Sequence, residues 1–263
     1  MSQLEVIQFR GFGNDVPEDD SEFFDVRQKQ WSFRPAVGFS FAKGSDLSLG
    51  PIVRHTTTDS TRSQFLATSE PYGFPSFAQA GAQAALTFDS RVEPDSSRPR
   101  FMLEVTGSAY PATWDVESAY ESVEGVAVAY ATLPLPKKPV IALRGGGKKL
   151  FGDFPYFDAA FLGGGSSFRT EHRQRFAGDA AVFGSAELRA PLFDFPFIFP
   201  MSVGALGFAD AGRVYMDGDS PGGWHTAFGG GLWIGAVDAA RNVNVVYTNK
   251  SSRRVIVSLG FAY

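Results

Sequence analysis

Apolar and polar residues alternate with a period of two along most of this 263-residue chain. From Trp31 to Phe41 every second residue is Trp, Phe, Pro or Val, while most residues between them are small or polar. Successive side chains of a β-strand point to opposite faces, whereas a helix would repeat every 3.6 residues. The pattern therefore predicts an all-β protein whose strands have one apolar and one polar face. The same alternation runs through residues 79–89, 101–110 and 254–263.

Strand length and the charges on the polar face favour a membrane barrel over a soluble β-sandwich, which would also alternate. The expected strands run for about ten residues or more, the length that a tilted strand needs to cross a bilayer. A dry sandwich core would hardly accept the charges on the polar faces, whereas a hydrated barrel interior would. We therefore expect a transmembrane antiparallel β-barrel with its apolar face turned to lipid. The polar-face charges are Arg34, Arg54, Glu104, Arg144, Lys148, Glu187 and Arg189.

About twelve strands are expected, and residues 1–263 are interpreted as one barrel domain. Short connections alternate with long ones, as in outer-membrane barrels. The phenylalanine-rich stretch 192–200 fits an aromatic girdle at a membrane interface, or else an apolar surface loop. The expected strands are residues 3–13, 24–42, 47–58, 79–91, 100–111, 119–133, 139–150, 180–192, 201–216, 224–237, 243–249 and 253–263.

Composition argues against several other classes of protein. The absence of cysteine excludes a disulfide framework, a thiolate metal site and a cysteine nucleophile. A net charge of −4 and a pI near 5.4 argue against nucleic acid as a partner. No apolar run approaches the 18 residues of a transmembrane helix, and the first residues do not resemble a signal peptide.

Enzyme motifs fail on inspection, so we expect no catalytic residues, no metal and no cofactor. Residues 145–149 read GGGKK but lack the upstream glycine and the following Ser or Thr of a phosphate-binding loop. Glycines that let neighbouring strands approach closely explain this stretch better. His55, His172 and His225 lie far apart, and none has the serine two residues later that an outer-membrane phospholipase would need.

Residues 161–192 (FLGGGSSFRTEHRQRFAGDAAVFGSAELRAPL) and 206–215 (LGFADAGRVY) resemble the BamA/TamA superfamily of outer-membrane barrels, also called bacterial surface antigens. That family has a glycine-rich loop with an arginine, then an ELR-like strand and an FxDxG strand. The segment 86–91 resembles its D-x-R hairpin, and 224–235 resembles its glycine-rich strand. The loop glycines are Gly163, Gly164 and Gly178, and the C-terminal pattern Val257, Leu259, Phe261 and Tyr263 resembles the outer-membrane assembly signal.

The resemblance implies a lock between this loop and the barrel wall, in which Arg169 pairs with Glu187 and Asp210. A guanidinium in a narrow lumen needs acceptors, and bidentate pairing with a carboxylate meets that need. Since Asp210 shares its face with Leu206 and Phe208, we expect a bulge near Gly207 or Gly212 to turn it inward.

The loop departs from the family pattern directly after the arginine. Thr170 stands where the family has glycine, and Glu171 stands where it has an aromatic residue. Glu171 could compete for Arg169, and Arg173 or Arg175 could serve as the inserted cation instead. The remaining alternative is a set of solvated loop charges without fixed partners.

The resemblance implies a protein of the Gram-negative bacterial outer membrane that acts in outer-membrane protein insertion, assembly or translocation. Its expected partners are outer-membrane lipid and lipopolysaccharide, the assembly machinery, and unfolded or secreted client proteins. The alternatives are the transport or anchoring barrel of a fused patatin-like or phosphoesterase effector, and a passive pore. Family barrels have sixteen strands, so this chain is expected to be a C-terminal portion of a larger protein, or else a barrel that closes with fewer strands.

Overall fold

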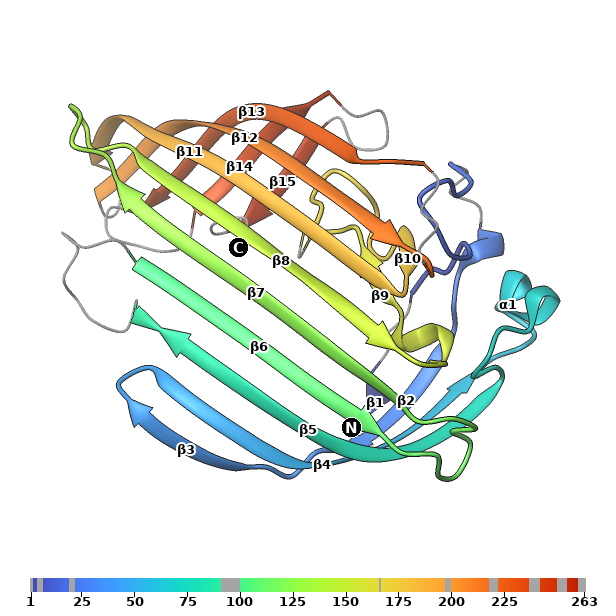
Figure 1. Ribbon diagram of the computed structural model, residues 1–263. Coiled ribbons are helices and arrows are strands. Elements are labelled where there is room, and N and C mark those ends of the chain that lie inside the picture. Colours follow the sequence, from blue (N-terminus) through green and yellow to red (C-terminus); the bar gives the residue numbers. More distant parts are fainter. Residues whose placement is uncertain are drawn as a thin grey trace.

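A single curved antiparallel sheet wraps around a hollow interior, and the loop between β8 and β11 lies inside it (Figure 1). The computed structural model describes residues 2–3, 7–18, 22–90, 100–165, 167–196, 200–217, 222–236, 242–249 and 255–259. The fold confirms the predicted all-β architecture of barrel type. Within the described residues, no helix has the length and apolar character to cross a bilayer.

The bounds of the wall strands agree closely with those of the expected strands over most of the chain. The N-terminal half contains β1 (Ser2–Gln3), η1 (Glu22–Phe24), β2 (Gln28–Phe33), β3 (Val37–Ala42), β4 (Ser45–Thr58), α1 (Gln64–Ser69), β5 (Ser76–Asp89), β6 (Arg100–Tyr110) and β7 (Tyr120–Thr132). The C-terminal half contains β8 (Val140–Phe151), η3 (Tyr156–Asp158), β9 (Ala160–Leu162), β10 (Phe176–Gly178), β11 (Ala180–Pro196), β12 (Pro200–Tyr215), β13 (His225–Ala236), β14 (Asn242–Thr248) and β15 (Val255–Leu259).

The sheet order is β1-β2-β4-β5-β6-β7-β8-β11-β12-β13-β14-β15, so the described path has the twelve strands that the sequence predicts. β3 also pairs with β4, in the same register as β2, because Phe33 faces Val53 and Val37 faces Leu49. β2 and β3 are thus two parts of the single strand predicted over residues 24–42. Pro35 interrupts it because proline has no N–H to donate to the ladder.

The predicted strand over residues 3–13 is wrong. β1 ends at Gln3, and the described segment that follows forms only isolated bridges, between Gln8 and Asp25 and between Gly13 and Ala177. Gly11 and Gly13 have φ values of 91° and 111°, which no regular strand contains. The segment instead crosses the loop end of the sheet and buries Phe9 there.

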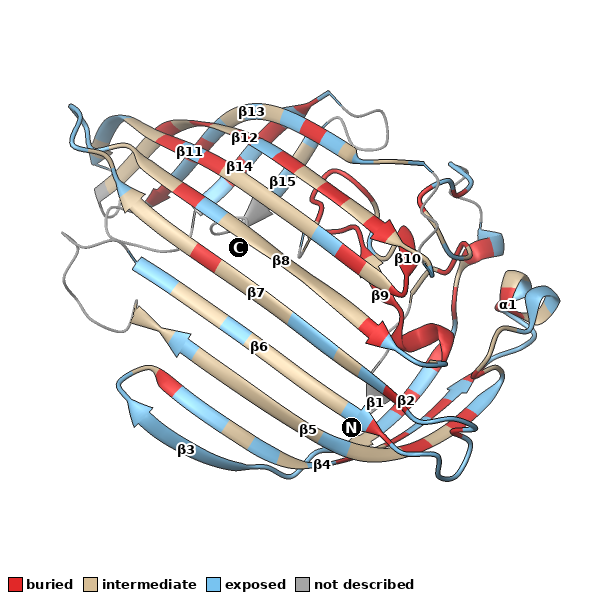
Figure 2. Ribbon diagram, in the orientation of Figure 1, coloured by how far each residue is buried: buried red, intermediate tan, exposed pale blue. Residues whose placement is uncertain are grey.

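The two faces of the sheet divide the residues as the alternation predicts (Figure 2). Arg54, Glu187 and Arg189 are buried inside, and the other four predicted polar-face charges line interior cavities. The outer face exposes large apolar side chains, which a soluble protein would bury. They include Trp31, Phe33, Phe39, Phe41, Leu49, Phe88, Leu143, Leu188, Phe193, Phe228, Leu232, Val245, Tyr247 and Val257.

Long connections gather at one end of the sheet, where they form a buried core (Figure 1). The N-terminal segment, the helix α1 and the loop after β8 meet there. Asn14 closes the contact with β12, since its amide donates to the Val214 carbonyl at 2.8 Å and its carbonyl accepts from the Val214 N–H at 3.0 Å. This core includes Phe9, Val16, Val26, Leu66, Phe77, Tyr110, Tyr120, Leu150, Tyr156, Phe157, Leu162 and Phe168.

Three glycines of the inner wall lie directly opposite aromatic residues of the neighbouring strand. Gly146 faces Phe183, Gly204 faces Trp233 and Gly229 faces Phe208. A Cβ atom at any of these glycines would lie 2.3–2.8 Å from the opposing ring. The rings therefore lie across the glycines. Gly146 belongs to the GGGKK stretch, so its contact is an example of the close approach expected there.

We predict that Gly50→Ala destabilises the sheet where β2 and β3 meet β4. A Cβ atom at Gly50 would lie 1.9 Å from the Pro35 carbonyl oxygen. Overpacking of this kind lowers the free energy of unfolding by about 1–3 kcal/mol, measurable by chemical denaturation monitored by tryptophan fluorescence. Gly38→Ala on β3 is the control, because nothing lies within 4 Å of its Cβ position. Equal losses in both variants would contradict the prediction.

Candidate functional site: the inward loop and its anchors

The loop over residues 152–179, here called the inward loop, lies inside the curve of the sheet (Figure 1). It contains η3 and a short antiparallel hairpin of β9 and β10. Its described residues contact β8, β11 and β12. These contacts decide how firmly the loop is held inside the sheet, and we treat them as the candidate site.

The predicted loop glycines have steric reasons to be glycine. Gly163 and Gly164 have φ values of 126° and 87°, which favour glycine. A Cβ atom at Gly163 would lie 2.3 Å from the His172 carbonyl oxygen, so the turn is also too tight for a side chain. Gly178 serves close approach, since its Cβ would lie 2.3 Å from the Tyr215 carbonyl oxygen.

The structure brings Arg169 together with Glu187 and Asp210, and we call this group the Arg169 clamp. The guanidinium forms a fork with Asp210, from Nε to Oδ2 at 2.8 Å and from Nη2 to Oδ1 at 3.0 Å. Its Nη1 donates to Glu187 Oε2 at 2.5 Å. The three side chains are only 8%, 1% and 0% exposed, in that order. One buried cation thus meets two buried carboxylates.

Further contacts fix the geometry of the clamp. Ser185 Oγ donates to Asp210 Oδ1 at 2.6 Å, and Arg189 Nε donates to Glu187 Oε1 at 2.6 Å. The Arg169 guanidinium carbon also lies 4.2 Å from the centroid of the Phe208 ring, a cation–π contact. Burial alone would lower the pKa of Arg169, but Asp210 and Glu187 outweigh it and raise that pKa. The two carboxylates therefore stabilise the cationic form of Arg169.

Strand register explains how both carboxylates reach one guanidinium. Asp210 lies opposite Ser185 and Phe208 lies opposite Glu187, so the two carboxylates are diagonal neighbours on the inner face. The bulge expected near Gly207 or Gly212 is absent from the β11–β12 pairing, whose register shift falls between Pro191 and Phe193. Asp210 points inward without a bulge, since the regular alternation of β12 places it on the inner face together with the apolar Leu206 and Phe208.

The departures from the family pattern are accommodated inside the loop. Thr170 is fully buried, and its φ is not positive, so this position does not require glycine. Glu171 forms an ion pair with Arg175 at 3.4 Å. Arg175 Nη2 also donates to the Pro17 carbonyl at 3.4 Å, whereas Arg173 lines a cavity. Of the three candidate arginines, Arg169 is the one that reaches the carboxylates of β11 and β12.

A second buried ionic cluster, at Asp158 of η3, was missed by the sequence reasoning. Asp158 accepts from Arg54 of β4, from Gln79 Nε2 of β5 at 3.1 Å and from the Tyr120 hydroxyl of β7 at 2.6 Å. Lys148 Nζ donates to its backbone carbonyl at 2.7 Å. Burial alone would raise the pKa of Asp158, but Arg54 and Lys148 outweigh it and lower that pKa. The sequence did place Arg54 on the polar face of its strand, and a buried guanidinium there needs a carboxylate partner, which is Asp158.

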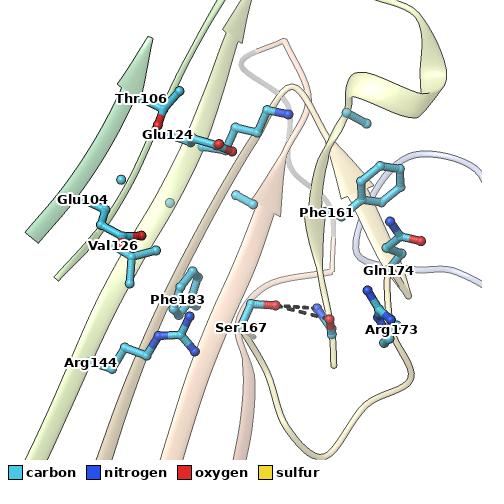
Figure 3. A pocket seen from close by; sticks show the side chains of 16 residues that line it. Glu104, Thr106, Glu124, Val126, Arg144, Phe161, Ser167, Arg173, Gln174 and Phe183 are labelled. Atoms are coloured by element: carbon cyan, nitrogen blue, oxygen red, sulfur yellow. Dashed lines mark hydrogen bonds between the residues drawn. The ribbon is translucent and has the colours of Figure 1, made fainter. Parts of the chain in front are cut away.

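Two cavities, of about 340 and 290 Å³, lie between the inward loop and the wall. Both are lined by Glu124 and Lys148 of the wall and by Gln174 of the loop. Figure 3 shows the larger one, with Glu104 and Arg144 on the wall side and Arg173 on the loop side. Within the described part of the chain, no group of acidic and histidine side chains could hold a metal ion.

The predicted C-terminal signal is only partly covered by the structure. Val257 lies on β15 and is 67% exposed. Leu259 ends that strand, and nothing is described of its side chain. Phe261 and Tyr263 lie outside the described residues, as does Arg91 of the D-x-R hairpin.

Comparison with known proteins shows the fold. No family model and no curated protein matches the chain. Among solved structures, it is similar to BamA from Haemophilus ducreyi lacking POTRA domains 1–3, with a TM-score of 0.66 and 16% sequence identity. The match covers 93% of this chain and 56% of that chain, so the chain spans about half the length of that structure. The chain thus has a BamA-like β-barrel fold.

We predict that Arg169→Gln lowers the free energy of unfolding by about 3–5 kcal/mol, because it leaves the buried Asp210 without its cation and leaves Glu187 with Arg189 as its remaining ion-pair partner. Arg173→Gln is the matched control and should change stability by about 0.5 kcal/mol or less, since Arg173 faces a cavity. Chemical denaturation of the refolded protein measures both variants. Equal effects would mean that the clamp contributes nothing specific.

Proposed function

We propose that this chain is the β-barrel of a non-enzymatic outer-membrane protein that inserts or translocates other proteins, with its inward loop locked by the Arg169 clamp. The observation that carries the proposal is the buried group of Arg169, Glu187 and Asp210 between loop and wall. A bidentate, buried ion pair fixes the loop in one place, which fits a barrel that controls access to its interior better than a permanently open pore.

The distribution of side chains supports placement in a membrane. The outer face exposes a series of large apolar side chains, while the seven polar-face charges named in the sequence analysis lie inside. Water would make such an outer face costly, whereas lipid favours it. The fold likeness to BamA supports the outer membrane as the compartment, and the partners proposed there are lipid, lipopolysaccharide, assembly machinery and unfolded client proteins.

The lock suggests how such a barrel would work. A loop held in the interior narrows the path for small solutes while the barrel waits for a client. Moving it would require Asp210 of β12 and Glu187 of β11 to lose Arg169, so a transition would involve the wall and the loop together. The Arg169 clamp is therefore the element whose occupancy we expect to differ between resting and active states.

We predict that Val105→Arg, at the centre of β6 on the outer face, lowers the free energy of unfolding in phosphatidylcholine vesicles by about 2–4 kcal/mol. Thr106→Arg is the matched control, because Thr106 points into the interior and lines both cavities. It should cost about 1 kcal/mol or less. If the outer face met water instead of lipid, Val105→Arg would also be nearly neutral, and membrane placement would be refuted.

We predict that Arg169→Gln slows client insertion by about tenfold or more, corresponding to ~1.4 kcal/mol in the barrier. The reason is that a loop without its clamp no longer holds β11 and β12 in the one resting arrangement from which the client-driven transition starts. The assay reconstitutes the chain in vesicles and follows the folding of a urea-unfolded outer-membrane barrel into the same vesicles. Arg173→Gln should retain the parent rate. A chain that conducts ions, does not accelerate insertion, and keeps its conductance in Arg169→Gln would instead be a passive pore.

A further inference from the structure

We propose that Asp158 is a second anchor of the inward loop, which holds the loop to a different part of the wall from the Arg169 clamp. The Asp158 cluster bonds to β4, β5, β7 and β8, whereas the Arg169 clamp bonds to β11 and β12. The inference concerns the loop of the proposed function, but it does not require that the barrel transports anything.

Asp158 is buried and accepts hydrogen bonds from several strands of the wall. Arg54 Nη2 donates to both carboxylate oxygens, and the two side chains are 6% and 9% exposed. The Tyr120 hydroxyl and the Gln79 amide donate to Oδ2. The carboxylate therefore accepts hydrogen bonds from three strands. A carboxylate buried with this many donors is held far more firmly than an exposed ion pair.

The two anchors have opposite polarity. At the Arg169 clamp the loop supplies the cation and the wall supplies carboxylates. At Asp158 the loop supplies the carboxylate, and Arg54 of the wall supplies the cation. A loop that left the hollow would leave buried charges of both signs in the wall without their loop partners, which is strongly unfavourable. Neither anchor can therefore replace the other.

The chain between the anchors is internally bonded. It contains β9 and the turn in which Phe168 N donates to the Gly164 carbonyl at 3.0 Å and Gly164 N donates to the Glu171 carbonyl at 3.2 Å. Asp158 and Arg169 thus hold the two ends of a segment whose described residues, 158–165 and 167–169, are linked by backbone hydrogen bonds. Because the anchors bond to different strands, loss of one should free its own end of the segment first.

The absence of cysteine from the chain allows a direct test with single-cysteine reporters. Ala159→Cys reports on the Asp158 end and Thr170→Cys on the Arg169 end, at positions 1% and 0% exposed. The protein is refolded in detergent, checked by heat-modifiable gel mobility, and labelled with a polyethylene-glycol maleimide. Labelling rates then measure local opening at each end.

Asp158→Asn should accelerate labelling at position 159 by about tenfold or more, since it removes a partner of a buried charged network. Labelling at 170 should change by about twofold or less in that variant, and Arg169→Gln should give the reverse pattern. The matched control is Asp153→Asn, an exposed loop carboxylate that accepts from Ser118 Oγ. It should leave both rates unchanged.

Two results would overturn the proposal. If both reporters accelerate together in Asp158→Asn, the loop opens as one unit and Asp158 is not a separate anchor. If neither accelerates, Asp158 does not hold the loop. Should Asp158→Asn fail to fold, Tyr120→Phe removes one donor from the cluster, and faster labelling at 159 alone is again required. No client is present, so failure of the proposed transport function would not alter this readout.

Discussion

Compensation of the buried Arg169 charge is the interaction on which the arrangement of the interior depends. A guanidinium shielded from water must meet acceptors of matching geometry, and here two adjacent strands provide them at diagonal positions. That demand fixes where the tip of the inward loop lies against β11 and β12. The loop hairpin and the N-terminal segment then pack around it, so that the loop end of the hollow becomes a protein core instead of a water-filled mouth.

Much of the fold could be predicted because alternation in a two-faced strand is a local property. The wall strands β4 to β8 and β11 to β14 coincide with expected ranges, and Pro35 divides the strand expected over residues 24–42 into β2 and β3. The short strands β9 and β10, which lie in the inward loop, were not expected. The partners of Arg169 came from resemblance to a family, and strand register explains their geometry. The bulge expected at Gly207 or Gly212 was wrong because the inner face of β12 tolerates Leu206 and Phe208 beside Asp210.

The parts that escaped prediction depend on contacts between distant residues. Arg54 and Asp158 are 104 positions apart, and no local pattern links a charge on a strand to a carboxylate in a 3-10 turn. The segment after β1 alternates enough to suggest a strand, yet Phe9 gains more by joining the aromatic core than by continuing the sheet. Such choices are decided by tertiary packing, which local propensity cannot report.

The aromatic rings that lie across Gly146, Gly204 and Gly229 affect the free width of the barrel interior. Each ring occupies the space that a neighbouring side chain would otherwise take, so the wall stays thin at these points. Adding a methyl group there would tilt Phe183, Trp233 or Phe208 away from the wall and narrow the bore around the loop. These glycines thus keep space free around the loop, and a substitution at one of them would change how the loop fits without changing any charge.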